Sequence, residues 1–295
     1  MSQQGAVAKL GIGTAQFGMP YGIANVRGRI PSPEVRDILA FAAENGIRLL
    51  DTASVYGESE SVIGDILGTG QDAFDIVSKF GLGEVPVSDV PSLLAGSFLR
   101  LKTNYLYGYL IHQYSDFTMN PLVWNVLKDL KDKGQVGKIG FSLYRTEELD
   151  FLMEKKILPD ILQVPYSIFD RRFEPYFLRL KDLGVEVHVR SIFLQGLIYL
   201  SSGKLPPYLK NVEASLNKLG EIAAGNSLTT GAICLNYVLG NHFVDNAVIG
   251  VDGLVQLKEN IANIRHMDQV CFLNKELAEV EIRDENILLP YKWEK

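Results

Sequence analysis

Cysteine is scarce in this chain, which has only two among its 295 residues, Cys234 and Cys271. The two lie far apart in the sequence and form no pattern typical of a metal site, and Cys234 is part of an apolar run that indicates a core position. So few cysteines exclude a disulfide-stabilised scaffold and are typical of the reducing cytoplasm. We therefore expect a cytoplasmic protein that is stabilised by its hydrophobic core.

Basic charge is also low, with 29 Lys and Arg against 35 Asp and Glu and a net charge of -6. Nucleic-acid binding needs basic surface that neutralises phosphates, so this balance argues against a nucleic-acid partner. His188, His242 and His266 show no ligand spacing. We expect these histidines to pack in the core or at the surface, and we expect no metal site.

Segments that would carry the chain to or across a membrane are missing as well. Met1–Gly5 has no basic region followed by an apolar stretch, so no signal peptide is expected. Residues 223–244 carry no formal charge, but they contain several Asn, Ser and Thr side chains that are too polar for a lipid-facing helix. A buried helix followed by a turn is the better interpretation, and no membrane partner is expected.

The glycine-rich fingerprint of Rossmann domains is not matched either. The nearest segment, residues 11–16, reads Gly-Ile-Gly-Thr-Ala-Gln and fails at its sixth position. The sequence therefore does not predict a Rossmann domain.

What the chain does contain is a repeated alternation of strand and helix. Eight apolar segments predict strands, and most follow one another at the spacing of one βα unit, about 25–35 residues. The strands are expected near residues 8–12, 47–50, 74–77, 107–111, 136–139, 161–164, 185–189 and 246–249. Alternation implies a parallel sheet, and eight units imply a closed (β/α)8 TIM barrel. No composition break divides the chain, so residues 1–295 are expected to form one domain.

Helical periodicity is clearest in two of the connections. One apolar face is predicted from Val35, Ile38, Leu39 and Ala42, with Ser32 as cap and Pro33 as first helical residue. A second face is predicted from Leu122, Val126, Leu127 and Leu130. The long connection between residues 195 and 245 is expected to contain a loop around residues 204–207 and then one or two helices.

Four residues that can carry chemistry lie at or just after the ends of predicted strands. Asp51, Lys79 and His112 each end one strand, and Tyr56 follows Asp51 in the motif Asp-Thr-Ala-Ser-Val-Tyr-Gly-Glu-Ser-Glu. Active sites of α/β barrels lie at the carboxyl ends of the strands. Taken singly, Asp51 is explained as a turn cap, Lys79 as a solvated surface charge, His112 as a buried histidine and Tyr56 as a loop aromatic. Their combination favours a catalytic site.

In this order and context the four residues resemble the catalytic tetrad of the aldo-keto reductases, and the resemblance runs from about residue 10 to about residue 260. It implies an oxidoreductase that reduces an aldehyde, ketone or sugar-like carbonyl, with Tyr56 as general acid and His112 orienting the carbonyl. Lys79 would lower the pKa of the tyrosine, and Asp51 would keep the lysine charged and aimed. The chemistry is consistent, because hydride transfer to a carbonyl puts negative charge on the oxygen that an acid must protonate.

The resemblance also implies that NADP or NAD lies extended across the barrel mouth. Ser142 and Gln163 match the family residues that hold the carboxamide, and Ser191 and Gly196 match the loop that approaches the pyrophosphate. Gly13 and Thr14 match the family's loop after the first strand, and Gly250 matches the start of its last phosphate-proximal loop. Gln256 and Asn260 match the positions that hold the adenosine end. Singly, the polar residues are equally well explained as strand-end hydrogen bonders and the glycines as turns.

Two departures from the family pattern concern the nicotinamide. Leu143 stands where the family usually has Asn, and Arg190 stands where it has an aromatic that stacks on the nicotinamide. A guanidinium can stack on a ring, but beside an oxidised, cationic ring it should disfavour the oxidised cofactor. Tyr166 and Phe193 are the candidates for the missing aromatic face.

A third departure concerns the choice between NADP and NAD. The loop from Gly250 to Gln256 has no Lys or Arg where NADP-specific members bind the 2′-phosphate, and Asp252 there should repel that phosphate and accept from an NAD ribose. Lys258 and Arg265 are candidate compensating cations. NADP is the family default, and we predict that the preference for it is weak here or reversed in favour of NADH.

Two functions remain open from the sequence. The first is an NAD(P)H-dependent carbonyl reductase with a small-molecule substrate, which the complete tetrad favours. The second is a reductase-like module that binds the cofactor, regulates a partner and turns over little, for which the three departures leave room.

Overall fold

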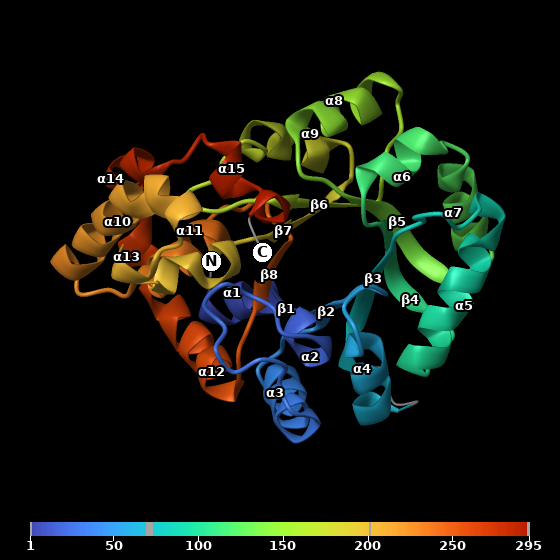
Figure 1. Cartoon of the computed structure of the whole chain (residues 1–295), viewed down its shortest axis with the longest axis horizontal. Helices are drawn as coiled ribbons and strands as arrows, with labels where there is room; N and C mark the ends of the chain where they lie inside the picture. The colour runs from blue at the N-terminus through green and yellow to red at the C-terminus, as the bar shows by residue number, and fades with distance from the viewer. Residues whose placement is uncertain (1, 69–72, 201, 294–295) are drawn as a thin grey trace.

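The computed structural model describes residues 2–68, 73–200 and 202–293, and its strands form a closed parallel barrel in the order β1 to β8 (Figure 1). The barrel closes where β8 pairs with β1. The strands are β1 Leu10–Gly13, β2 Leu49–Asp51, β3 Asp75–Phe80, β4 Leu106–Ile111, β5 Val136–Ser142, β6 Ile161–Pro165, β7 Glu186–Arg190 and β8 Asn246–Gly250. The predicted (β/α)8 TIM barrel is confirmed.

Helices connect the strands and lie around the outside of the sheet in Figure 1. The α-helices are α1 Gln3–Ala8, α2 Ala15–Gly18, α3 Ser32–Glu44, α4 Ser59–Leu67, α5 Val90–Leu101, α6 Tyr114–Met119, α7 Val123–Asp132, α8 Thr146–Glu154, α9 Phe177–Asp182, α10 Glu213–Gly225, α11 Thr230–Leu239, α12 Leu254–Asn263, α13 Met267–Cys271, α14 Asn274–Leu277 and α15 Glu285–Leu288. Short 3-10 helices are η2 Val87–Asp89, η3 Glu174–Tyr176, η4 Leu194–Tyr199, η5 Ser202–Lys204, η6 Pro207–Val212, η7 Ile264–His266, η8 Ala278–Val280 and η9 Pro290–Lys292.

The core has two parts because successive side chains of a strand point to opposite faces. One face of the strands packs with the helices in a large apolar cluster, to which Leu50 and Ile76 belong. The other face fills the barrel interior with a smaller cluster of one residue from each of five strands: Leu49, Val77, Leu110, Ile161 and Val248. A filled interior leaves the mouth of the barrel as the place for a site.

The first predicted strand began too early. Ala8 is the last residue of α1, whose start is capped by the Ser2 hydroxyl accepting from the Gly5 amide at 3.1 Å, and β1 begins only at Leu10. Ala6 and Val7 are buried in α1 and Leu10 is buried in β1, so these few apolar positions could not separate helix from strand.

The predicted helix faces were right in one case and partly wrong in the other. Val35, Ile38, Leu39 and Ala42 are the buried residues of α3, although the N-cap is Pro31 and Ser32 is already helical. In α7 the buried residues are Val123, Trp124, Leu127 and Leu130, while Leu122 precedes the helix and is 64% exposed. The tryptophan, which the predicted face left out, is turned to the core and stacks on Phe141.

The connection between β7 and β8 contains α10 and α11, which confirms the predicted helices. The loop predicted around residues 204–207 includes the end of the 3-10 helix η5 and the start of η6. Eight of the ten residues of α11 are buried, which confirms that this uncharged segment is a core helix. Within the described ranges, no helix combines the length and the apolar character that crossing a membrane requires.

Candidate active site

The carboxyl ends of the strands surround a cavity whose wall includes Asp51, Tyr56 and His112. Asp51 is the last residue of β2, His112 follows β4 directly, and Lys79 is the next-to-last residue of β3. Parallel strands place their carboxyl ends at one mouth. Lys79 is 1% exposed and lies behind Asp51, so the structure brings all four predicted residues to one place.

The position of Tyr56 depends on close packing between its loop and α2. A β-carbon on Gly18 would lie 1.9 Å from the Tyr56 carbonyl oxygen, so only glycine permits this approach. Gly57 has a φ of +57°, and a side chain there would meet the Gly18 carbonyl oxygen at 2.5 Å. Ser59, at the start of α4, donates to the Thr14 carbonyl oxygen at 2.9 Å and ties the end of the loop to the end of β1.

Lys79 and Asp51 form a buried ion pair below the cavity. The lysine Nζ donates to Asp51 Oδ1 at 2.7 Å and to the Thr52 carbonyl oxygen at 2.9 Å. The second carboxylate oxygen accepts from Gln163 Nε2 at 2.6 Å. Buried charges are tolerated only when paired and hydrogen-bonded, and here both oxygens of the carboxylate have a donor. The sequence did not predict that Gln163 contacts Asp51.

Tyr56 lies between the lysine and the histidine. The Lys79 Nζ is 5.3 Å from the centroid of the Tyr56 ring. The Tyr56 and His112 rings meet edge to face, with centroids 5.7 Å apart and an interplanar angle of 84°. This arrangement offers a phenol and an imidazole to the same cavity, with a cation directly behind the phenol.

Burial is the largest cause of the pKa shifts of His112 and Tyr56. Desolvation, followed by the charges of Lys79 and Arg190, lowers the pKa of His112 to about 3. Desolvation, followed by the Asp51 carboxylate, raises the pKa of Tyr56 well above its ordinary value. Burial and the Asp51 charge therefore outweigh any lowering of this pKa by Lys79, whose influence on Tyr56 stays a prediction. At neutral pH the site contains a protonated phenol and a neutral imidazole.

We expect the imidazole of His112 to stay neutral between about pH 5 and pH 8, where an ordinary histidine titrates. An NMR titration of labelled histidine checks this, with His112→Gln to assign the signals, and a midpoint near ~6.5 would contradict it. Because the folded pKa is lowered, the unfolded state binds the proton first. His112 should therefore reduce stability as the pH falls from ~6.5 towards 3, and His112→Gln should weaken that pH dependence.

Most of the residues predicted to face a cofactor line the same cavity. The lining includes Gly13, Thr14, Gln163, Arg190, Ser191, Gly196, Gly250, Asp252 and Gln256. Two predicted residues lie outside this lining and are buried: Ser142, which is paired in register with Gln163, and Asn260 on α12. A cofactor role for these two residues therefore stays a prediction, which the cavity lining does not support.

The buried oxygen of Gln163 tests whether a nicotinamide fits. Gln163 is fully buried and lines the cavity, and its Oε1 has no hydrogen-bond partner among the described residues. A buried acceptor without a donor is costly, so this oxygen is suited to a ligand that brings an N–H group. A carboxamide carries such a group, and the residues present therefore fit the nicotinamide end of the cofactor.

The model of the aldo/keto reductase family matches residues 9–270, which is most of the chain. The chain belongs to the aldo/keto reductase family. An oxidoreductase of Mycobacterium tuberculosis is 30% identical over 174 residues, a match that spans 56% of this chain and about half, 51%, of that relative. An NADH-specific methylglyoxal reductase of Escherichia coli is 26% identical over 314 residues, covering 92% of this chain and 95% of its own. The holo form of the Bacillus halodurans aldo-keto reductase AKR11C1 has the same fold, with a TM-score of 0.73 at 22% identity over 95% of each chain.

In this aldo/keto reductase, Arg190 stacks on a tyrosine that the sequence analysis did not single out. Its Cζ lies 4.0 Å from the centroid of the Tyr144 ring, and its Nη2 donates to the Leu143 carbonyl oxygen at 2.9 Å. Of the two aromatics proposed to replace the missing ring, only Phe193 lines the cavity. Tyr166 is 1% exposed and packs edge to face on Phe177, so it is a core residue.

A cation that the sequence did not indicate, Arg27, contacts the Asp252 loop. Arg27 Nη1 donates to the Asp252 carbonyl oxygen at 2.6 Å, although 225 residues separate the two. The cations that the sequence suggested are engaged elsewhere: the Lys258 ammonium lies over the Phe41 ring at 5.3 Å, and Arg265 Nε donates to His266. The segment between α2 and α3 therefore places an arginine beside the Asp252 loop.

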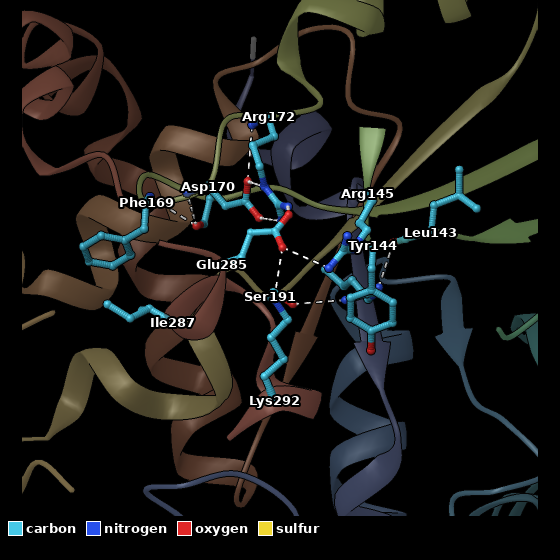
Figure 2. A network of polar contacts seen from close by, with 12 residues as sticks. Leu143, Tyr144, Arg145, Phe169, Asp170, Arg172, Ser191, Glu285, Ile287 and Lys292 are labelled. Atoms are coloured by element: carbon cyan, nitrogen blue, oxygen red, sulfur yellow. Dashed lines mark hydrogen bonds and ion pairs between the residues drawn. The ribbon is translucent and has the colours of Figure 1, made fainter. Parts of the chain in front are cut away.

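The C-terminal segment closes another side of the cavity, where Pro290 contributes to the wall. Figure 2 shows Glu285 at the centre of the network that attaches this segment to the barrel. The Glu285 carboxylate pairs with Arg145 at 3.0 Å, Lys292 at 3.1 Å and Arg172 at 3.5 Å, while Arg172 also pairs with Asp170 at 2.8 Å. The segment is thus attached to the loops that follow β5 and β6.

Breaking this attachment should affect substrate binding more than stability. We expect Glu285→Gln to raise the KM for an aldehyde roughly two- to fivefold, because partly exposed ion pairs contribute about 0.2–1 kcal/mol each. The Kd for the cofactor should not change. Steady-state kinetics and fluorescence titration check both values, with Glu279→Gln, which breaks a surface pair with Lys218, as matched control. An unchanged KM would contradict the role of Glu285.

Proposed function

We propose that this protein reduces the carbonyl group of a small aldehyde, ketone or sugar-like molecule with hydride from NADH or NADPH. The observation that carries the proposal is the meeting of Asp51, Tyr56, Lys79 and His112 at one cavity. Membership of the aldo/keto reductase family and the oxidoreductase names of its relatives support the same class of reaction.

The proposed roles follow from the protonation of the site. The cofactor, when bound, would supply the hydride. The Tyr56 phenol donates its proton to the carbonyl oxygen as negative charge develops there. The neutral imidazole of His112 donates a hydrogen bond to the same oxygen and orients it. Lys79, positioned by Asp51, stabilises the phenolate that remains after the proton has left.

The cofactor would be bound by groups from β1 and from β5 to β8. Gln163 would accept from the carboxamide, and Gly13, Ser191 and Gly196 would lie near the phosphates. The Arg190 guanidinium lies over the Tyr144 ring, at the position where the nicotinamide would stack. We propose that this charge disfavours the oxidised cofactor and so favours reduction of the substrate.

A cofactor titration followed by a substrate panel tests the proposal. Quenching of protein fluorescence by NADH and NADPH measures binding, and loss of nicotinamide absorbance with methylglyoxal, glyoxal and glyceraldehyde measures turnover. Binding and turnover together are expected. Failure to bind either cofactor would overturn the proposal.

The second candidate function is a cofactor-binding regulatory module, which the replacement of the family's stacking aromatic by Arg190 favours. Tight cofactor binding without turnover on any aldehyde would support it over the reductase. We also propose that residues 1–295 act as one domain in the cytoplasm, a placement that the free thiols of Cys234 and Cys271 support.

A further inference from the structure

Glu34 and Arg27 form a compact anion–cation pair at one end of the cavity. Arg27 Nη2 donates to Glu34 Oε2 at 2.6 Å, and Nη1 donates to Glu34 Oε1 at 3.2 Å, so the pair is bidentate. The same Nη1 donates to the Asp252 carbonyl oxygen at 2.6 Å. Asp252 itself lines the cavity that also contains Tyr56, so the pair lies against the wall of the proposed cofactor site.

The Glu34 carboxylate also occupies the start of a helix. Its Oε1 accepts from the Leu254 amide, the first residue of α12, at 3.1 Å. Residue 253 is glycine, and a β-carbon there would lie 2.5 Å from Glu34 Oε1 and 2.3 Å from Arg27 Nη1, so a side chain at this position would displace the pair. The carboxylate is therefore bound by a helix N-terminus and a guanidinium at once.

A helix N-terminus and an arginine guanidinium both commonly bind phosphates in proteins. The N-terminus of a helix presents unpaired amides and positive potential to an anion, and arginine binds phosphate through the same two parallel bonds that it makes to a carboxylate. In this chain the Leu254 amide and the Arg27 guanidinium already donate to the carboxylate of Glu34 from α3. A phosphate that reached them would have to displace Glu34 or lie beside its charge.

We propose that Glu34 is a specificity-determining residue that excludes the 2′-phosphate of NADPH and so selects NADH. The proposal rests on the proposed function, because it assumes that a nicotinamide cofactor binds in this cavity. NADH places two hydroxyls at the ribose where NADPH carries a dianion, so it meets no repulsion from Glu34 or Asp252. Arg27 holds the Asp252 loop in place through the carbonyl oxygen and is not free to bind the phosphate.

The experiment measures Kd for NADH and NADPH by calorimetry in the wild type, in Glu34→Ala and in Glu34→Gln. Glu34→Ala removes the charge and opens the space, so NADPH should bind about ten- to a hundredfold tighter, the value of one charge-assisted contact. Glu34→Gln removes the charge alone and should give a smaller gain. NADH binding should change little in both variants.

Two further variants make the result specific. In Glu34→Ala/Arg27→Met the gain for NADPH should disappear, because the guanidinium that Glu34 released is gone. Asp65→Asn, which breaks the exposed pair with Lys102, is the control for loss of a surface carboxylate and should leave both Kd values unchanged.

The outcomes separate this inference from the proposed function. NADPH binding that is much tighter than NADH binding in the wild type, or a Kd ratio that Glu34→Ala does not change, would overturn the role of Glu34 while the reductase proposal stands. Failure of both cofactors to bind the wild type would overturn the proposed function. The same series with 2′,5′-ADP and 5′-ADP reports on the 2′-phosphate without the nicotinamide, and only the former should gain affinity in Glu34→Ala.

Discussion

Tyr56→Phe is expected to lower the rate of carbonyl reduction by about 10²–10⁴-fold, the usual contribution of a general acid. The substitution removes the hydroxyl and keeps the ring, which packs edge to face on His112 and lies over the Lys79 ammonium. The loop should keep its position, because Gly18 and Gly57 determine its packing against α2. Cofactor binding should therefore stay close to that of the wild type.

The measurement is kcat/KM with an aldehyde, together with the cofactor Kd by fluorescence titration. Tyr199→Phe is the matched control, because Tyr199 is a second phenol on the same cavity wall and has no proposed role in proton transfer. Its kcat/KM should be close to that of the wild type. If Tyr56→Phe retained wild-type turnover, the proton would come from another group and the assignment of the tetrad would be wrong.

Lys79→Met should lose activity and also about 3–5 kcal/mol of folding free energy. The lysine is the charge partner of Asp51, and both side chains are almost fully buried, at 1% and 6% exposed. Removing one member of a buried pair leaves an uncompensated charge, which is the costly way to break it. The Asp51 charge would then also act on Tyr56 without opposition, so its pKa should rise and the alkaline limb of the pH–rate profile should move to higher pH.

Denaturant unfolding of the single and double variants separates the two effects. Lys79→Met/Asp51→Asn removes both charges and should recover most of the lost stability, while activity stays low. A single variant that is as stable as the wild type would show that the pair contributes nothing to folding. An alkaline limb that does not move would remove Lys79 from its proposed influence on the phenol.

The strands and the tetrad could be predicted because their signals are local. Each buried strand is a short apolar run between helical segments, and Asp51, Lys79 and His112 each lie at the end of such a run. Parallel strands in a closed barrel bring those ends together without further information. The errors at Ala8 and Leu122 are at element ends, where local preference is weakest.

The contacts that could not be predicted join distant segments through side chains. Gln163 donates to Asp51 across 112 residues, and Arg27 donates to the Asp252 carbonyl oxygen across 225. Such pairs depend on which rotamers the packing allows, and no spacing rule in the sequence describes them. The direction of the Tyr56 pKa shift could not be predicted for a related reason, because it depends on burial, which a list of neighbouring charges does not report.

The tetrad and the rest of the cavity wall come from separate stretches of the chain. The four tetrad residues lie within residues 51–112, whereas the remaining wall comes from β1 and its following loop, from the ends of β5 to β8 and from Pro290. Substitutions can therefore accumulate in the second set without altering the proposed proton donor, Tyr56. In evolutionary terms, a lineage with this architecture can keep the segment that carries these four residues while the walls that contact substrate and cofactor diverge.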